Sequence, residues 1–513
     1  MRRSVYHDSV TLMRLTHDME AVAGVRRAAA MMGTPANRAL LAEAGLLAAE
    51  GESAGPADLV ITVVADAAAA AAAACVAAEA ALTAGRTAPA GSRPRPRTLA
   101  GALRAFPDAT LALISVPGVY AGVEARRALD AGLHVMLFSD NVPVETEIEL
   151  KRVATERGLF VMGPDCGTAL VAGVPLGFAN AVPRGRIGLV AASGTGLQEV
   201  SCRLAAEGEG VSHAIGVGGR DLSDAVGGRM TMAALAALAA DPATEVVIVV
   251  SKPSGATVAA RLTEALRALG KPSVVCAAGA DATPGAAPSA GPAGATMYVA
   301  ATLEDAALAA VALARGRTPR AVELTPPAAE IESLVATQVA ALAPGQRFVR
   351  GVYSGGTLAW EAVALLRARL PGVAAGVRGD GPGHRVVDLG DDTFTLGRLH
   401  PMIDGAVRRE WIEREAADPA TAVVLLDVVL GYGAHPDPAA ELVPALEAAR
   451  RQVTAAGRGL VVIAGVTGTE QDPQVRSRQV ATLRRASVCV MDSNAQAARL
   501  AALVAARVSV GRP

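Results

Sequence analysis

A chain of 513 residues is too long to fold around one hydrophobic core, so we expect about three or four domains. Its formal net charge of −1 gives no electrostatic reason to expect a nucleic acid or an anionic membrane as a partner. Hydrophobic residues make up 51% of the chain and aromatic residues only 3%, which favours Ala-rich helices packed on Val-rich strands, as in α/β proteins.

No basic segment followed by an apolar stretch opens the sequence, so no signal peptide is expected. The most apolar run, 66–82, contains Glu79 and is too short and too weakly hydrophobic to span a membrane. The cysteines form no CxxC pair and no zinc-ligand spacing. They are Cys75, Cys166, Cys202, Cys276 and Cys489. We therefore predict a cytoplasmic protein with no membrane partner and no metal site.

The chain begins with a block, 1–83, in which short apolar runs alternate with helical patterns, and this predicts a small α+β domain. Within it, Thr34 and Pro35 after Gly33 predict a helix start, with Thr as N-cap and Pro at the first helical position. The stretch 84–98 is rich in Pro, Gly and Arg and has no period, so we predict a linker.

Beyond the linker, continuous apolar strands alternate with amphipathic helices, which is typical of doubly wound parallel sheets. We place one such domain at 99–182 and a second at 183–314. A second linker is predicted at 315–345, followed by a last α/β domain at 346–513. The predicted fold class is multidomain α/β.

The two later domains contain similar sequences. “GLVAASGTGLQEVSCRL” (188–204) and “GVYSGGTLAWEAVALL” (351–366) share a strand, a Ser-Gly turn and a helix with a Glu near its start. The tetrapeptide Asp-Pro-Ala-Thr precedes a buried strand at both 241–244 and 418–421. Two copies of one domain are the simplest explanation.

Each copy opens its helix with a turn of Ser, Gly and Thr. Backbone N–H groups are free at such a turn, the helix dipole adds positive charge, and small residues allow close approach. We predict that both turns bind phosphate or carboxylate, with simple helix capping as the alternative. The predicted anion-binding residues are Ser193, Gly194, Thr195, Gly196, Ser354, Gly355, Gly356 and Thr357. Neither turn matches the P-loop pattern GxxxxGK[ST].

A second glycine-rich turn, “GVGGRD” (216–221), follows an apolar strand, where α/β folds place their ligands. Gly218 and Gly219 would let a ligand approach the backbone, while Arg220 would bind an anion that Asp221 orients. A structural Arg–Asp pair is the alternative.

Further candidates have equally ordinary alternatives. Cys166 is a nucleophile or an inert buried thiol, His213 a catalytic or a core histidine, and Lys252 a phosphoryl ligand or a solvated strand-end residue. The segment 388–404 clusters acidic residues with a histidine, and such acidic pairs bind Mg²⁺, orient water or turn a loop. Its candidates are Asp391, Asp392 and His400.

“GPDCGTALVAGVPLGFANAVPRGRIGLVAASGTGLQE” is similar to the α-subunit of succinyl-CoA synthetase, and “LALISVPGVYAGVEARRALDAGLHVMLFSDNVP” resembles its CoA-binding domain. The last block resembles the carboxy-terminal domain of the β-subunit. “MMGTPAN”, “SKP”, “LGDDTFTLGRLHPMID” and “VTGTEQDP” narrow the resemblance to the FdrA family.

The resemblance implies a Rossmann-like CoA-binding-type domain followed by two flavodoxin-like CoA-ligase-type domains. It implies a cofactor site at Val116, Pro117, Gly118 and Asp165, and leaves open whether CoA binds there. In the synthetase two helix N-termini serve a phosphohistidine, but the matching region here, 277–295, contains no histidine. No ATP-grasp domain is recognisable either, so the resemblance implies no ATP site in these residues.

A fold with two anion sites but no phosphohistidine can use a preformed acyl phosphate. FdrA-like proteins are associated with allantoin breakdown, as subunits of an oxamate carbamoyltransferase assembly. The resemblance therefore implies carbamoyl transfer from carbamoyl phosphate to oxamate, giving oxalurate and phosphate, with Lys252 and Arg220 neutralising phosphate. It also implies partner subunits. The alternatives are an acyl-CoA ligase subunit with a separate ATP-grasp partner, and a non-catalytic scaffold that binds CoA or other subunits.

Overall fold

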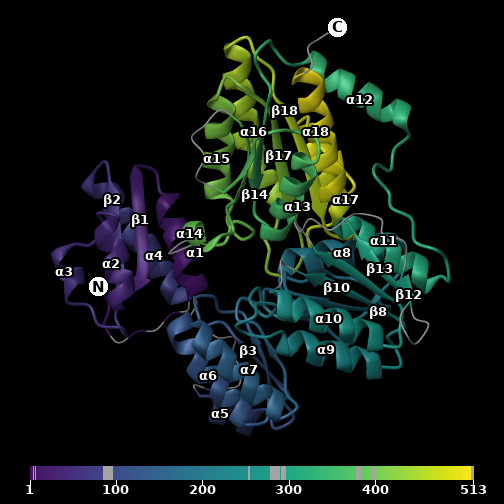
Figure 1. Cartoon of the computed structure of the whole chain (residues 1–513). Coiled ribbons are helices and arrows are strands. Elements are labelled where there is room, and N and C mark those ends of the chain that lie inside the picture. Colours follow the sequence, from purple (N-terminus) through teal and green to yellow (C-terminus); the bar gives the residue numbers. More distant parts are fainter. Residues whose placement is uncertain are drawn as a thin grey trace. The chain divides into compact units, whose positions relative to one another are not determined.

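The computed structural model describes residues 1–3, 5, 7, 9–84, 96, 98–251, 255–277, 289–290, 296–376, 383–395 and 399–509 (Figure 1). The chain divides into two compact units, residues 1–109 with 392–399 and residues 110–391 with 400–513. Among the described helices, none has the length and apolar character needed to cross a bilayer.

The first unit contains the block 1–83, expected to be a small α+β domain, and is built on a two-stranded antiparallel sheet. Its strands are β1 (Val25–Met32) and β2 (Leu59–Ala65), and its helices are α1 (Ser9–Glu20), α2 (Pro35–Glu43), α3 (Ala49–Glu52), α4 (Ala68–Ala84), α5 (Leu99–Ala105) and α14 (Asp392–Thr395). Successive residues of β2 face opposite cores, because Leu59 packs with α1 and α4 whereas Val60 packs with α2. The predicted helix start is confirmed, since Thr34 Oγ1 accepts the Asn37 N–H at 3.2 Å and Pro35 opens α2.

The second unit begins with a short parallel sheet of the Rossmann type, in the order β3-β4-β5. Its elements are β3 (Leu111–Ile114), α6 (Gly118–Asp130), β4 (His134–Leu137), α7 (Val144–Glu156) and β5 (Val161–Met162). The hairpin of β6 (Thr168–Val171) and β7 (Val174–Gly177) pairs with the next sheet instead. Strands β6 and β7 therefore precede the domain boundary expected at 182–183 in the sequence but belong to the sheet that follows it.

The next sheet has the order β12-β13-β11-β10-β8-β9-β6-β7 in the described part of the chain, and its central strands are parallel. Its strands are β8 (Arg184–Ala191), β9 (Val211–Gly216), β10 (Val246–Ser251), β11 (Ser273–Ala277), β12 (Ser289–Ala290) and β13 (Thr296–Ala300). Its helices are α8 (Gly194–Ala206), α9 (Arg229–Ala240), α10 (Ala256–Ala268) and α11 (Leu303–Ala314).

The last sheet is parallel throughout its described strands, in the order β15-β16-β14-β17-β18-β19. Its strands are β14 (Phe348–Tyr353), β15 (Val373–Ala375), β16 (His384–Asp388), β17 (Thr421–Val429), β18 (Val461–Thr467) and β19 (Cys489–Met491). Its helices are α12 (Ala328–Ala340), α13 (Gly356–Arg367), α15 (Ala406–Ala417), α16 (Pro438–Ala455), α17 (Arg476–Arg485) and α18 (Asn494–Ser509).

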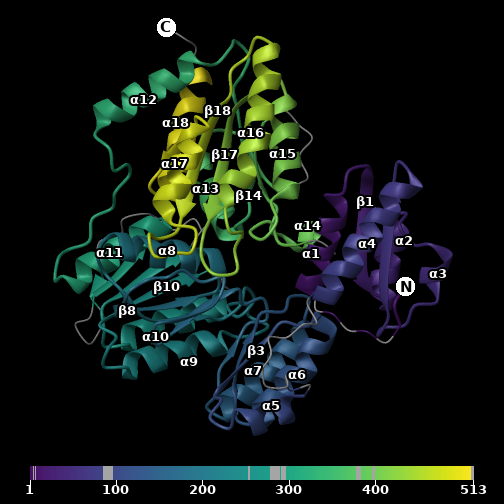
Figure 2. The same cartoon turned by 180° about the vertical axis from the view of Figure 1, so that it is seen from behind.

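The two large sheets repeat one topology. The order β9-β8-β10-β11-β13 of the first corresponds to β16-β14-β17-β18-β19 of the second, and each Asp-Pro-Ala-Thr directly precedes or opens the equivalent strand, β10 or β17. This confirms two copies of one flavodoxin-like domain. Helices α8 and α11 of the first copy face α13 and α18 of the second (Figures 1 and 2). The apolar side chains of these helices belong to one continuous core.

Two buried carboxylates join the copies reciprocally. Glu199 of α8 accepts the backbone N–H of Asn494, the first residue of α18, at 3.2 Å. Glu361 of α13 accepts the backbone N–H of Leu303, the first residue of α11, at 2.7 Å. Each copy therefore caps a helix of the other, at the end where the helix dipole favours a carboxylate.

The Glu361 cap predicts a pH-dependent stability. Burial raises the pKa of Glu361 from its ordinary value of 4.5 to about 7, despite the hydrogen bonds from Leu303 and Asn494. The protonated form is favoured in the folded state, so this contribution is complete below pH 4.5 and is lost as the pH rises through about 7. It corresponds to about 3 kcal/mol. Thermal unfolding should show a lower stability at pH 8 than at pH 5, and Glu361→Gln, which does not titrate, should reduce that difference.

The matched control is Glu410→Gln, which changes an exposed carboxylate on α15 of the same domain. It should retain the wild-type pH dependence. Equal pH dependence in wild type and Glu361→Gln would contradict the prediction.

Candidate functional site

The turn before α8 combines a capped helix start with open backbone donors. Ser193 is the N-cap, and its Oγ accepts the Gly196 N–H at 3.0 Å. The N–H groups of Gly194 and Thr195 find no acceptor among the described residues, and both residues are partly exposed. Ser193 and Gly196 thus serve the helix itself, while Gly194 and Thr195 can receive an anion at the positive end of the helix dipole.

The equivalent turn before α13 already holds a carboxylate of the protein. The N–H groups of Ser354 and Gly355 donate to Asp427, at 2.9 and 2.8 Å, and the Ser354 hydroxyl adds a third bond at 3.0 Å. Asp427 is fully buried and pairs with Arg408 at 2.9 Å. The prediction of an external anion at Ser354 and Gly355 was therefore wrong, because an internal carboxylate satisfies these donors.

The difference between the copies has a visible sequence cause. Asp427 and Val250 stand at the same distance after the Asp-Pro-Ala-Thr of their repeats. Val250 Cγ1 lies 3.0 Å from where a Cβ on Gly196 would stand, so in the first copy an apolar side chain borders the turn and cannot accept hydrogen bonds. The donors that Asp427 satisfies therefore precede α13, whereas the N–H groups of Gly356 and Thr357, like those of Gly194 and Thr195, find no acceptor among the described residues.

The two turns meet directly across the domain contact. Ser193 Oγ and Thr357 Oγ1 are 2.5 Å apart, and a Cβ on Gly355 would lie 2.9 Å from Thr195 Cγ2. Two stretches that are remote in sequence therefore form one site, in which Thr357 contacts Ser193 and Gly356 is partly exposed.

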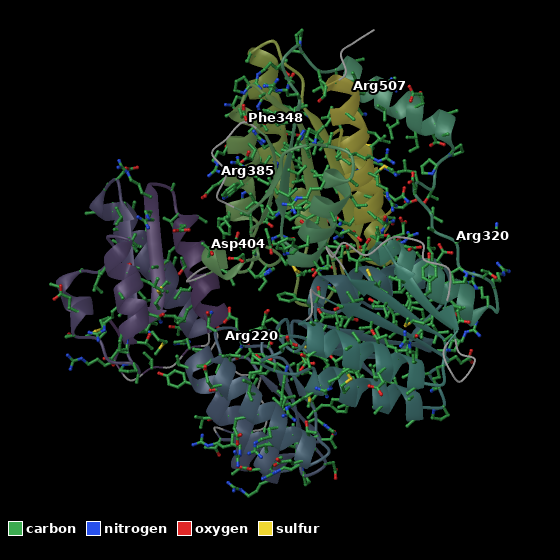
Figure 3. The ribbon with its side chains drawn as sticks, in the orientation of Figure 1. Arg220, Arg320, Phe348, Arg385, Asp404 and Arg507 are labelled. Atoms are coloured by element: carbon green, nitrogen blue, oxygen red, sulfur yellow. The ribbon has the colours of Figure 1, made fainter. Side chains whose placement is uncertain are left out.

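Arg220 and Asp221 of “GVGGRD” bond to other residues of the protein and not to each other. Asp221 is buried and accepts the N–H of Thr231 in the first turn of α9 at 2.9 Å, as well as Lys151 Nζ at 2.8 Å. Arg220, labelled in Figure 3, donates from Nε to Glu147 at 2.9 Å. Asp221 thus anchors the loop to α7 and does not orient a ligand at Arg220, whose side chain remains 47% exposed.

Lys151 and Glu147 form a buried ionic cluster with Asp221 that sequence reasoning missed. Lys151 is fully buried and bonds to Glu147 at 2.8 Å and to the Val217 carbonyl at 2.9 Å. The signal was present, because Lys151 is one of three lysines in the chain and stands four residues after Glu147 on a predicted helix. Gly218 also proves structural, since its Cβ would lie 2.4 Å from the Pro164 carbonyl oxygen. Its neighbour Gly219 is partly exposed in the same turn.

His213 lies away from the open turn. Its Nδ1 accepts the N–H of Ala172, in the β6–β7 turn, at 3.2 Å, and its Nε2 is 3.9 Å from Asp241. Asp241 precedes β10, at the amino ends of the parallel strands, whereas Ser193 follows the carboxyl end of β8. The structure therefore corrects the catalytic assignment of His213.

Cys166 is a buried structural thiol. Burial raises its pKa to about 12, and its Sγ lies 3.5 Å from the carbonyl oxygens of Thr168 and Gly216. A thiol that stays protonated near neutral pH is a poor nucleophile, so the structure does not support the catalytic assignment. Lys252 lies outside the described residues.

The residues expected to form the cofactor site gather at the carboxyl ends of β3, β4 and β5. Val116 and Pro117 connect β3 to α6, and a Cβ on Gly118 would lie 2.3 Å from the Asp140 carbonyl oxygen after β4. Asp165 follows β5, and its N–H donates to Ser139 at 3.0 Å. The edge is the one at which parallel sheets bind ligands.

In the cluster predicted at 388–404, Gly390 packs against both His400 and Asp388. His400 Nδ1 accepts the Met402 N–H at 3.2 Å. Burial, and then the nearby Arg408 cation, lowers the pKa of His400 to about 4, so the ring is neutral near neutral pH. A Cβ on Gly390 would lie 2.8 Å from His400 Nε2 and 3.2 Å from Asp388 Oδ1.

The structure describes the side chain of only one member of the predicted acidic pair, Asp391 and Asp392. Asp391 is exposed, and the side chain of Asp392 lies outside the description. Asp388 also lies against the open end of α13, because a Cβ on Gly356 would be 2.6 Å from its Oδ2. Among the described residues, no group of three or more His, Cys, Asp or Glu side chains is arranged to hold a metal ion.

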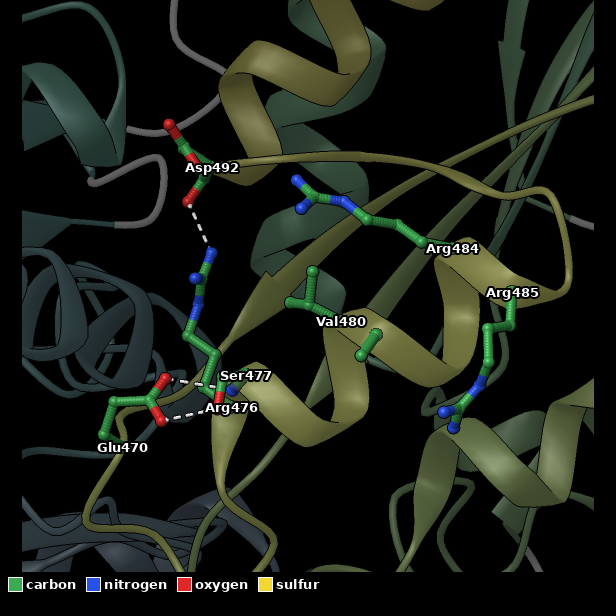
Figure 4. Close-up of a pocket in the computed structure, with 8 residues that line it drawn as sticks. Glu470, Arg476, Ser477, Val480, Arg484, Arg485 and Asp492 are labelled. Carbon is green, nitrogen blue, oxygen red and sulfur yellow. Dashed lines mark hydrogen bonds between the residues drawn. The ribbon is translucent and has the colours of Figure 1, made fainter.

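A basic pocket of about 650 Å³ opens beside α17 (Figure 4). Glu470 accepts the backbone N–H and the hydroxyl of Ser477, at 2.9 and 2.8 Å. Arg476 donates to the Asp492 carbonyl at 3.4 Å. Arg484 reaches into the pocket and forms no ion pair with a described carboxylate. The pocket adds positive charge near the carboxyl ends of β18 and β19.

Comparison with known proteins identifies the family. One family model, for CoA-ligase, matches residues 352–504, and another, for the heavy metal-associated domain of AllF, matches residues 1–96. The protein YahF of Escherichia coli (strain K12) is 38% identical over 512 residues, which are 98% of this chain and 97% of that protein. The chain belongs to the FdrA family, within the succinyl-CoA synthetase superfamily.

This FdrA-family chain is also similar to subunits of CoA ligases. The succinate–CoA ligase (ADP-forming) subunit alpha-2 of Trichomonas vaginalis is 32% identical over 186 residues, 35% of this chain and 59% of that protein. The ADP-forming sulfoacetate-CoA ligase subunit SauD of Bilophila wadsworthia is 29% identical over 167 residues, 31% of this chain and 55% of that protein. These similarities cover just over half of each relative.

Soft metals are held by groups of thiolate and thioether ligands. The residues that match the heavy metal-associated model contain one cysteine, the exposed Cys75 on α4, and five methionines, of which Met19 and Met32 are buried in the core. Polar groups around the turn between β1 and α2 are used locally, because Thr34 caps α2 and Asn37 Nδ2 donates to the Met32 carbonyl at 2.8 Å.

The buried charges around Lys151 predict a large loss of stability on truncation. Lys151→Met leaves the carboxylates of Glu147 and Asp221 without their buried cation, which should lower the free energy of unfolding by about 3–5 kcal/mol. Arg152→Met on the same helix is the control, since its pairs with Glu149 and Glu156 lie in solvent and their loss should leave the free energy of unfolding almost unchanged. Urea denaturation measures both, and equal losses would contradict the assignment.

Proposed function

We propose that this FdrA-family chain is a subunit of a carbamoyl-transferring enzyme, in which the turn before α8 binds the phosphate of carbamoyl phosphate. The reaction would transfer the carbamoyl group to oxamate, giving oxalurate and phosphate. The observation that carries the proposal is the pair of open N–H groups at Gly194 and Thr195, in the first turn of α8.

An open helix start suits a phosphate group carried by a substrate. The region 277–295, which would correspond to a phosphohistidine loop, contains no histidine. A preformed acyl phosphate needs no such residue. Arg220 keeps its side chain 47% exposed, so it remains available to a phosphate, and Lys252 is proposed for the same role.

The chain is also proposed to act with other subunits, because the similar CoA ligases are named as subunits. Carbamoyl phosphate and oxamate are added to the full chain together with the proteins that co-purify with it, and oxalurate is measured. Oxalurate formation without ATP supports the transferase. Thioester formation that requires ATP and CoA supports a ligase, and CoA binding without turnover supports a scaffold, and either result would overturn the proposal.

Phosphate binding should depend on one backbone donor. Gly194→Pro removes the N–H at the first helical position, where proline is otherwise well tolerated and where Ser193 already has the extended conformation that proline requires. Because a hydrogen bond to a charged group is worth about 1.5–3 kcal/mol, calorimetry with inorganic phosphate should show an affinity about ten- to a hundredfold lower.

Gly194→Ala is the control, because it adds a Cβ at the same place, 3.1 Å from Thr168 Oγ1, but keeps the N–H. Its phosphate affinity should stay near that of the wild type. Equal affinities of the two variants would exclude this N–H as a phosphate donor.

A further inference from the structure

The pocket of about 650 Å³ beside α17 contains charged side chains that do not neutralise one another. The guanidinium of Arg484 forms no ion pair or hydrogen bond with a described group, and the same holds for the carboxylate of Asp492. Both side chains are exposed to solvent. A cation and a carboxylate therefore line one cavity, and each is available to a ligand.

Arg476 adds a second cation, which the backbone holds in place. Its Nε donates to the Val466 carbonyl at 3.2 Å, and its Nη2 donates to the Asp492 carbonyl at 3.4 Å. Figure 4 shows Arg476 and Arg484 both extending toward Asp492, whereas Arg485 points away from them. Arg485 is also used within α17, because it donates to the Thr482 hydroxyl at 3.1 Å. The cationic wall of the pocket is thus Arg476 and Arg484.

Asp492 is the acceptor that the pocket leaves open. The other carboxylate, that of Glu470, is already used by the backbone N–H and the hydroxyl of Ser477. Asp492 directly follows β19, at the carboxyl end of a parallel sheet, which is the edge at which such sheets bind ligands. Val480 and Ala481 supply the apolar part of the lining.

These groups together match the chemistry of a nucleoside phosphate. The planar fork of a guanidinium binds phosphate oxygens in pairs, and a carboxylate at the end of a strand accepts the hydroxyls of a ribose. A simple inorganic anion would leave Asp492 unpaired beside it. The volume also fits, since pockets for small organic ligands measure about 300–1,000 Å³.

We propose that this pocket binds a nucleoside phosphate, with Arg484 and Arg476 donating to its phosphate oxygens and Asp492 accepting its ribose hydroxyls. The lining includes no residue of the turn before α8, so this site is distinct from the one proposed for carbamoyl phosphate and does not depend on it. It borders the same helix, because Arg203 of α8 donates to the Asp492 carbonyl at 3.5 Å. Such a site is built on a parallel sheet and needs no ATP-grasp domain.

Calorimetry of ADP binding to the full chain tests the phosphate contact. Arg484→Gln removes the charge and should lower the affinity for ADP about ten- to a hundredfold, as expected for hydrogen bonds to a charged group. Arg478→Gln is the matched control, since Arg478 lies on the same helix outside the pocket and is 54% exposed. Its ADP affinity should stay near that of the wild type. Gly194→Pro should also keep ADP affinity, because the turn before α8 takes no part in this site.

The ribose contact is tested with 2′,3′-dideoxy-ADP, which keeps the base and both phosphates. The wild type should bind ADP about tenfold more tightly than the dideoxy compound, and Asp492→Ala should reduce this preference to about twofold or less. CoA carries a 3′-phosphate in place of one ribose hydroxyl, so it should displace ADP poorly. Thermal unfolding of each variant reports whether the fold is kept.

Several results would overturn the inference. They are no ADP binding to the wild type, equal losses in Arg484→Gln and Arg478→Gln, and an unchanged ribose preference in Asp492→Ala. A loss of ADP affinity in Gly194→Pro as large as that in Arg484→Gln would also contradict it, because the phosphate would then lie at the turn before α8. Displacement of ADP by CoA as readily as by ADP itself would exclude the ribose contact.

Discussion

The reciprocal capping of helices by Glu199 and Glu361 is the contact on which the arrangement of the second unit depends. Each carboxylate belongs to a helix of one repeat and accepts the N–H of the first residue of a helix in the other repeat. A carboxylate taken out of water needs such donors, because burial alone strongly disfavours its charge. Burial nevertheless raises the pKa of both carboxyl groups, so their charged forms are disfavoured at this contact between the repeats.

This joint also decides what the two glycine-rich turns can do. The capping glutamates lie in the helices that those turns begin, so holding the helices face to face brings Ser193 and Thr357 into contact. The two turns, each predicted as an anion site, therefore lie side by side. The N–H groups of Gly194 and Thr195 are among those that find no acceptor in the described part of the chain, and both residues are partly exposed.

The two repeats have kept one topology but no longer have the same chemistry. Asp427 at the end of β17 fills the turn of the second repeat, and Val250 stands at the matching place in the first. Only the carboxylate can satisfy backbone donors, so the N–H groups of Ser354 and Gly355 are bonded within the second repeat. Asp388 lies against Gly356, the first residue of α13, where a Cβ would be 2.6 Å from its Oδ2.

Short-range sequence patterns were sufficient to predict the helices and strands named here and the repeated domain. The N-cap at Thr34, the strands of the doubly wound sheets and the helix start at Ser193 depend on residues within a few positions of each other, and the structure places them as expected. The repeated Asp-Pro-Ala-Thr correctly indicated two copies, because homologous strands keep the residues that start them.

The assignments that required a distant partner could not be made in this way. Asp221 was expected beside a ligand and is instead bound to Lys151, and His213 points to the amino ends of the strands. The bond of Asp427 to Ser354 likewise joins residues that local patterns treat as independent. A polar group bonds within the protein or stays available to a ligand, depending on which groups the packed chain brings within about 3 Å of it. For these residues the partners come from distant parts of the sequence, so only the tertiary structure decides between the two.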